Sequence, residues 1–221
     1  MDAEDVVLWG GRCGGRILSQ AFHTFARQYS QRLAAAVDAL PLDAVEALAE
    51  ALLGCWRDGR QVFIFGNGGS AGNAIHLAND YLYGISRQLG HGLRVTALSA
   101  NSSVLTCLAN DEGYDGIFFR QLAVLAEPGD VAIAFSGSGN SPNIVKALEW
   151  CRDHGLQSFA VLGYSGGKAK TLADVPIHVA VDDMQISEDL QLIVGHMMMQ
   201  WLYRHHESIE PTSGNTWQAL K

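Results

Sequence analysis

The sequence predicts an α/β fold, a three-layer α/β/α sandwich around a parallel sheet. Five short runs rich in Val, Ile and Phe, namely "QVFIF", "RVTAL", "DVAIAF", "SFAVLG" and "VPIHVAV", alternate with longer amphipathic segments. Strands separated by helix-length connections pair in parallel, because antiparallel neighbours need only a tight turn. Strands that are apolar throughout belong to a sheet with both faces covered, which gives three layers.

The helices that this fold requires can be placed by their apolar periodicity. Two are expected before the first strand, Arg16–Leu40 and Asp43–Arg57, separated by Pro41. Further helices are expected to begin near Ala71, Asn101, Gly116, Pro142 and Gly167, and a last helix to span 187–204 with Ser187 as its candidate N-cap. We therefore divide the chain into an N-terminal helical segment (1–57), an α/β domain (58–204) and a polar tail (205–221).

Composition excludes several classes of protein. A net charge of −8 without a Lys/Arg block argues against a non-specific nucleic-acid binder, which must neutralise backbone phosphates. No apolar run approaches the roughly 18 residues that cross a bilayer, and residues 1–15 are acidic where a signal peptide would be basic. The four cysteines lack the paired spacing of metal or redox motifs. We expect a cytoplasmic protein with no membrane or nucleic-acid partner.

Two loops of small residues follow predicted strands. "FIFGNGGSAGNAIHLAND" begins at Phe63, and "VAIAFSGSGNSPNIVKALEW" begins at Val131; each runs from an apolar strand through a Gly/Ser loop into a helix. In a parallel sheet both loops open at the carboxyl edge, where ligands bind. Glycines let the backbone approach an anion, and the helix start offers N–H groups and a favourable dipole. The two loops therefore predict a phosphate site.

A dinucleotide site is the first alternative. Residues 66–71 also satisfy a relaxed G-x-G-x-x-A fingerprint, which alone is a weak signal. The second strand, "RVTAL", is followed by "SANSS" and lacks the acidic residue that would bind an adenosine ribose. This absence disfavours nucleotide-dependent redox chemistry.

Three motifs carry a family resemblance. "GNGGSAGNAIHLAND", "LANDEGYDGIF" and "SGSGNSPNIVKAL", in this order, resemble sugar isomerase (SIS) domains and, within them, the phosphoheptose isomerases, which interconvert sedoheptulose 7-phosphate and a heptose 7-phosphate. The likeness runs from about Leu40 to Arg204. It implies a flavodoxin-like five-stranded sheet, N-terminal helices used in oligomerisation, and a homotetramer with active sites at subunit interfaces.

The resemblance also implies site residues. Those that would bind substrate or phosphate are Asn67, Gly68, Gly69, Ser70, Asn110, Asp111, Ser136, Gly137, Ser138 and Ser141. Those that would bind a metal, Zn²⁺ in the family, are His76, Asp80, Glu188 and His196, of which the last three would also conduct the proton transfer. Three positions depart from the family pattern, with Gly137 for threonine, Asp80 for glutamate and Glu188 for glutamine.

The spacing of the four metal-site residues can be judged independently. His76 and Asp80 are four residues apart, so on a helix they lie on one face and can bind one cation. Imidazole and carboxylate ligands suit Zn²⁺ but also Mn²⁺, Fe²⁺ or Ni²⁺. Glu188 and His196 are separated by a rise of roughly 12 Å on a regular helix. Either Glu188 lies at a distorted helix start, or the two residues act from different subunits.

The expected function is aldose–ketose isomerisation of sedoheptulose 7-phosphate to D-glycero-D-manno-heptose 7-phosphate through an enediol. Asp80 or Glu188 would be the base and His196 the acid/base partner, while the loops anchor the phosphate. The shorter side chain of Asp80, by about 1.5 Å, leaves Glu188 as the alternative base. An isomerase of a related sugar phosphate and a non-catalytic SIS sugar-phosphate-binding regulator remain alternatives, although the two retained histidines favour an enzyme.

Overall fold

The computed structural model describes residues 14–85 and 92–206. The chain divides into two compact units, residues 1–38 and residues 39–221. The predicted tail lies outside the described residues from residue 207 onward.

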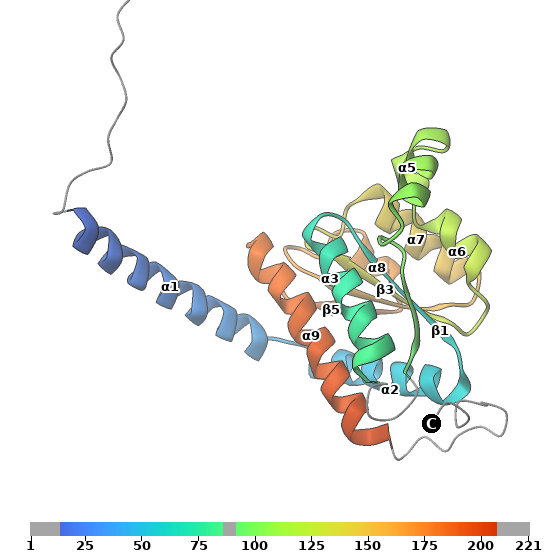
Figure 1. Cartoon of the computed structure of the whole chain (residues 1–221), viewed down its shortest axis with the longest axis horizontal. Helices are drawn as coiled ribbons and strands as arrows, with labels where there is room; N and C mark the ends of the chain where they lie inside the picture. Colours follow the sequence, from blue (N-terminus) through green and yellow to red (C-terminus); the bar gives the residue numbers. More distant parts are fainter. Residues whose placement is uncertain (1–13, 86–91, 207–221) are drawn as a thin grey trace, which may run out of the picture. The chain divides into compact units, whose positions relative to one another are not determined.

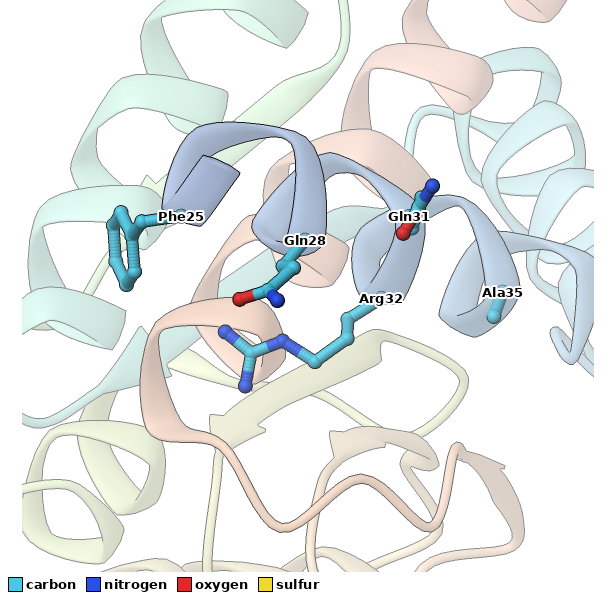
Figure 2. Close-up of a pocket in the computed structure, with 5 residues that line it drawn as sticks. All are labelled: Phe25, Gln28, Gln31, Arg32 and Ala35. Carbon is cyan, nitrogen blue, oxygen red and sulfur yellow. The ribbon is translucent and has the colours of Figure 1, made fainter. Parts of the chain in front are cut away.

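The described part of the first unit is a single helix, α1 (Gly14–Asp38). It carries the exposed aromatic side chains of Phe22 and Phe25, whose ring centroids are 6.5 Å apart. Figure 2 shows five side chains on successive turns of α1 that line a pocket, namely Phe25, Gln28, Gln31, Arg32 and Ala35. The helix ends close to the predicted position, because Pro41 disfavours helical backbone in the residue before it.

The second unit begins with α2 (Leu42–Asp58), which starts directly after Pro41 as predicted. Gly59 follows in the left-handed conformation, with a φ of 68°, and ends the helix. One face of α2 is apolar and buried, including Leu48, Leu52 and Trp56. This face packs α2 against the sheet and α9.

The sheet has five strands, all parallel, in the order β2-β1-β3-β4-β5. Their bounds are β1 Gln61–Gly66, β2 Arg94–Ala97, β3 Val131–Ser136, β4 Gln157–Leu162 and β5 Val175–His178. The five predicted strands and the flavodoxin-like order are thereby confirmed. The strand order reverses direction between β1 and β3, and ligands of such sheets bind at this switch point.

Helices cover both faces of the sheet (Figure 1). One face carries α5 (Ser102–Asp111), the short 3₁₀ turn η2 (Tyr114–Gly116), α6 (Phe119–Leu125), α7 (Pro142–Asp153) and α8 (Ala169–Leu172); the other carries α2, α3 (Gly69–Asn79) and α9 (Met184–His205). Phe63 and Phe65 of β1 pack with Ile144 and Leu148 of α7 in one buried cluster. Because strand side chains alternate, the buried Val62 and Ile64 face the other layer.

The start of α9 differs from the predicted start. The helix begins at Met184 because the Asp183 carboxylate accepts hydrogen bonds from the backbone N–H groups of Gln185, at 3.1 Å, and Ile186, at 3.2 Å. The prediction that Ser187 is the N-cap is wrong. Its side chain is buried inside the helix and donates to the Asp183 carbonyl oxygen at 2.8 Å.

A π-helical turn, η1 (Asp80–Gly84), follows α3 and was not predicted. Its backbone closes with the Ile85 N–H donating to the Asp80 carbonyl oxygen at 3.0 Å. Such wide turns are rare and occur frequently at functional sites. Asp80, a predicted metal ligand, is the first residue of this turn.

Two further expectations concern membranes and thiols. Within residues 14–85 and 92–206, none of the helices combines the length and the apolar character that crossing a membrane requires. Cys55, Cys107 and Cys151 are free thiols, and burial raises the pKa of Cys55 and of Cys151 to about 12. These two buried thiols are therefore protonated at neutral pH and have no nucleophilic role.

The contact of α3 with α9 is tight at Gly195, and this generates the first prediction. A Cβ atom at Gly195 would overlap the side chain of Leu77 on α3. We expect Gly195→Ala to destabilise the fold by about 1–3 kcal/mol, the usual cost of overpacking. The measurement is urea denaturation.

The matched control is Gly54→Ala in α2, where a Cβ would meet nothing within 4 Å. This change should stabilise the protein by up to about 1 kcal/mol, because alanine is the better helix former. Equal free energies of unfolding for the two variants would show that α3 and α9 are not closely packed at Gly195.

Candidate active site

The first Gly-rich loop connects β1 to α3. Gly68 has φ 55° and ψ −122°, a conformation that residues with a side chain rarely adopt, and it allows the chain to turn sharply into the helix. Asn67 is half-buried, Gly68 and Gly69 are exposed, and Ser70 is buried in the first turn of α3. The exposed backbone of this loop can therefore approach a ligand, whereas Ser70 supports the loop from within.

The second loop connects β3 to α7. The Ser136 hydroxyl is buried and accepts a hydrogen bond from the Gly139 N–H at 3.0 Å. Asn140 ties the loop to the next one, since its Oδ1 accepts from the Lys168 N–H at 3.1 Å. Ser141 is the N-cap residue of α7, and within the described part of the chain its hydroxyl makes no capping bond. The loop is held rigid while Ser138 and Ser141 remain at the positive end of the helix dipole.

Gly137 replaces the threonine expected from the family resemblance, and the structure shows what fills the space. A Cβ at Gly137 would lie 2.6 Å from the Met184 sulfur and 3.2 Å from its methyl carbon. Met184 is the first residue of α9. The second loop therefore has a thioether beside it where a hydroxyl is expected.

A pair of amides connects the two loops. The Asn67 side chain donates from Nδ2 to Asn143 Oδ1 at 2.9 Å, and Asn143 Nδ2 donates back to Asn67 Oδ1 at 2.8 Å. The Tyr114 hydroxyl also donates to Asn67 Oδ1, at 3.0 Å. Asn143 and Tyr114 were not identified from the sequence.

Glu188 projects from α9 onto the first loop. A Cβ at Gly69 would overlap the Glu188 carboxylate, so this carboxylate lies directly against the start of α3. Asn73 of α3 donates from Nδ2 to the Glu188 backbone carbonyl at 2.9 Å and to Gln191 Oε1 at 3.0 Å. A negative charge is stabilised at a helix N-terminus. Glu188 is therefore held at the loop that is expected to bind substrate.

The other end of the α3–α9 contact brings together His76, Asp80 and His196. The His76 and His196 Nε2 atoms are 3.0 Å apart, and Asp80 Oδ2 lies 3.4 Å from the first and 3.6 Å from the second. The side chain of His76 is 50% exposed, that of His196 44% and that of Asp80 17%. These three residues, which we call the His–Asp–His cluster, are open to solvent on one side.

The donor set of the cluster fits a divalent cation. One ligand atom from each residue lies within 4.8 Å of the other two. Two imidazole nitrogens and a carboxylate oxygen with an open position form a ligand set that suits Zn²⁺ and neighbouring transition metals. The two Nε2 atoms are 3.0 Å apart, which is close enough for both to bind one ion.

The structure does not bring the fourth predicted ligand, Glu188, to this cluster. Glu188 lies in the second turn of α9, so the first of the two alternatives, a distorted helix start at Glu188, is wrong. Eight residues of regular helix, a rise of about 12 Å, separate Glu188 from His196. Within one chain, three of the four predicted ligands therefore lie together, and Glu188 lies apart from them.

Asn110 and Asp111 lie at the end of α5, and both are exposed. Asn110 Nδ2 donates to Asp111 Oδ1 at 2.7 Å, and the Cys107 thiol is 3.4 Å from Asp111 Oδ2. The hydrogen bond to Asp111 raises the pKa of the Cys107 thiol. Both side chains are open to solvent, and their contact with substrate stays a prediction.

Comparison with known proteins identifies the family. The profile of the SIS domain matches residues 24–163. A curated phosphoheptose isomerase from Trichlorobacter lovleyi is 39% identical over 156 residues, covering 70% of this chain and 78% of that protein. The chain belongs to the phosphoheptose isomerase family of SIS-domain proteins.

Two further family members extend this match. The phosphoheptose isomerase of Chlorobaculum tepidum is 36% identical over 196 residues, which covers 86% of this chain and 91% of that protein. The solved structure of phosphoheptose isomerase from Neisseria gonorrhoeae superposes with a TM-score of 0.74 at 27% identity, over 83% of this chain and 97% of that one. The family fold thus extends well beyond the segment that the SIS profile matches.

The His–Asp–His cluster generates the second prediction. We expect one Zn²⁺ per chain to bind in calorimetry, and His196→Ala to weaken the affinity at least about tenfold, because an imidazole ligand is lost. His154→Ala is the control, since His154 is exposed and stacks on Trp150 in α7. Equal affinities in all three proteins would place the metal elsewhere.

Proposed function

We propose that the protein is an aldose–ketose isomerase that interconverts sedoheptulose 7-phosphate and D-glycero-D-manno-heptose 7-phosphate through an enediol. The observation that carries the proposal is that ligand atoms of His76, Asp80 and His196 lie within 4.8 Å of one another. The same chain also has two Gly/Ser-rich loops of the kind that bind phosphate. Membership of the phosphoheptose isomerase family supports the same reaction.

The loops are proposed to anchor the phosphate. Hydroxyls of Ser138 and Ser141 and the exposed backbone at Gly68 and Gly69 donate to anionic oxygens, helped by the dipoles of α3 and α7. Binding energy from this remote group orients the reacting end of the sugar and raises the rate of the chemical step. The loss of a threonine hydroxyl at Gly137 leaves this backbone donation unchanged.

The proton transfer needs a base beside the carbon acid and an acid for the oxygen. His76, Asp80 and His196 would hold a divalent cation, which we propose is Zn²⁺ and whose chemistry is polarisation of the sugar carbonyl. Asp80 Oδ2 already faces both imidazoles, whereas the Glu188 carboxylate lies at the substrate loop. We therefore assign Glu188 as the base. His196 is kept as a cation ligand, because an imidazole nitrogen that binds a cation cannot also exchange a proton with the sugar oxygens.

A homotetramer with shared sites is part of the proposal. Three apolar residues within two positions of a cluster residue in the sequence are exposed in the single chain, namely Ile75, Leu82 and Met197. Exposed apolar patches of this kind are usually covered by a partner. The separation of Glu188 from the cluster supports an active site that draws on more than one subunit. The aromatic face of α1 supports an oligomerisation role for the N-terminal helices.

We place this enzyme in the cytoplasm, which suits its unpaired thiols.

A related sugar phosphate is the second candidate substrate. The observation in its favour is the Met184 thioether beside Gly137, which changes the shape and polarity of the phosphate loop. A non-catalytic regulator is disfavoured, because binding alone does not require two imidazoles and a carboxylate to converge.

The third prediction tests the reaction. The purified protein should convert sedoheptulose 7-phosphate to the aldose, and Glu188→Gln should lower kcat about a hundredfold or more because it removes the base while preserving shape. The control is Glu149→Gln, which changes an exposed carboxylate on α7. Unchanged kcat in Glu188→Gln would exclude Glu188 as the base. Turnover of other sugar phosphates alone would favour the second candidate.

The fourth prediction tests the shared site. Glu188→Ala and His196→Ala proteins should each be inactive, and mixing them after reversible dissociation should restore measurable activity, because some mixed sites then contain both intact residues. The control mixes two preparations of Glu188→Ala alone. If the mixture stays inactive although mass spectrometry shows mixed oligomers, each active site belongs to one chain.

A further inference from the structure

The side-chain amide of Asn143 is fully buried in the first turn of α7. It makes three hydrogen bonds, and two of them go to Asn67, which precedes Asn143 by 76 residues. The third comes from the Ile144 backbone N–H, which donates to Asn143 Oδ1 at 2.9 Å and also to the Ser141 carbonyl oxygen at 3.0 Å. Asn143 thus reaches from the second loop to the first.

These contacts determine the orientation of both amides by chemistry alone. The Ile144 N–H can only donate, so the Asn143 atom that faces it must be the oxygen. Asn143 Oδ1 must then accept from Asn67 Nδ2, and Asn143 Nδ2 must donate to Asn67 Oδ1. The Tyr114 hydroxyl faces the same Asn67 oxygen and therefore donates to it. The Ile144 N–H thus determines which atom donates and which accepts in each of these hydrogen bonds.

As a consequence, the Asn67 side chain has one hydrogen-bonding group left for a ligand. Asn67 Oδ1 has two lone pairs and accepts two hydrogen bonds, from Asn143 and from Tyr114. Asn67 Nδ2 uses one of its two hydrogens on Asn143, so among residues 14–85 and 92–206 one N–H is left without a partner. An asparagine normally offers ligands both a donor and an acceptor. In this arrangement Asn67 offers a donor alone, which suits phosphate and alkoxide oxygens and disfavours donors such as ammonium groups.

We propose that Tyr114 and Asn143 are positioning residues that lock the Asn67 amide as a one-way hydrogen-bond donor to the bound sugar phosphate. The inference rests on the proposed function only for the identity of the ligand. Tyr114 acts from η2 and is 58% exposed, whereas Asn143 acts from the buried start of α7. The lock also links the first loop to the start of α7, the helix that follows the second loop.

Tyr114→Phe is the informative variant, because it removes a single hydroxyl from an exposed ring. The ligand is the polyol phosphate obtained by reducing the carbonyl of sedoheptulose 7-phosphate, which keeps the phosphate and hydroxyls but cannot isomerise. In calorimetry we expect Tyr114→Phe to weaken binding about three- to tenfold, the worth of one hydrogen bond. In the isomerase assay KM should rise by a similar factor while kcat stays within about twofold.

A double-mutant cycle separates positioning from direct contact. In an Asn67→Ala background the Tyr114→Phe change should have no further effect, because the amide that it orients is absent. Asn143→Asp provides a second variant, since it keeps the acceptor for Ile144 and removes the donor to Asn67; it should weaken binding more than Tyr114→Phe does. Thr171→Val is the control, as it removes an exposed hydroxyl on α8 that donates to the carbonyl oxygen of Lys168, the residue before this helix.

Each outcome decides the proposal. Loss of affinity that disappears in the Asn67→Ala background supports the lock, even if the wild type proves unable to isomerise the sugar, in which case only the proposed reaction fails. Unchanged affinity in Tyr114→Phe, an equal loss in both backgrounds, or a wild type that does not bind the polyol phosphate overturns it.

Discussion

The close parallel packing of α3 against α9 is the constraint on which the site depends. Gly195 has no side chain, so Leu77 can pack against the α9 backbone, and the buried Tyr81 hydroxyl donates to the Gly195 carbonyl at 3.0 Å. At one end of this contact Glu188 meets the start of α3; at the other, His196 meets His76. Because the packing of two helices sets both positions, the separation of Glu188 from the His–Asp–His cluster follows from the fold rather than from loop conformation.

The two loops depend on a different kind of interaction. Parallel pairing of β1 with β3 brings their carboxyl ends together at the switch point of the sheet. The buried amide of Asn143 then joins the first loop to the start of α7 by hydrogen bonds, and a buried polar network of this kind helps to specify one arrangement. Helix packing thus sets the positions of Glu188 and the His–Asp–His cluster, and a polar network sets the positions of the groups that we propose anchor the phosphate.

Local patterns predicted most of the fold and part of the site. The apolar runs gave the five strands, and the spacing of His76 and Asp80 gave their shared face, because both signals lie within one element. Contacts between distant residues were not predictable in this way: Tyr114 and Asn67 are 47 residues apart, and nothing near either one indicates the other. The start of α9 was missed because Asp183 and Ser187 are both good capping residues, and only the structure shows which one faces free N–H groups.

The most direct test of the central claim is an X-ray absorption spectrum of the Zn²⁺-loaded protein at the zinc edge. The packing of α3 on α9 predicts two nitrogen ligands at about 2.0–2.1 Å with the outer-shell scattering of imidazole, completed by oxygen ligands. A spectrum that shows sulfur ligands, or that lacks imidazole scattering, would contradict the assignment of His76, Asp80 and His196 as the cation site.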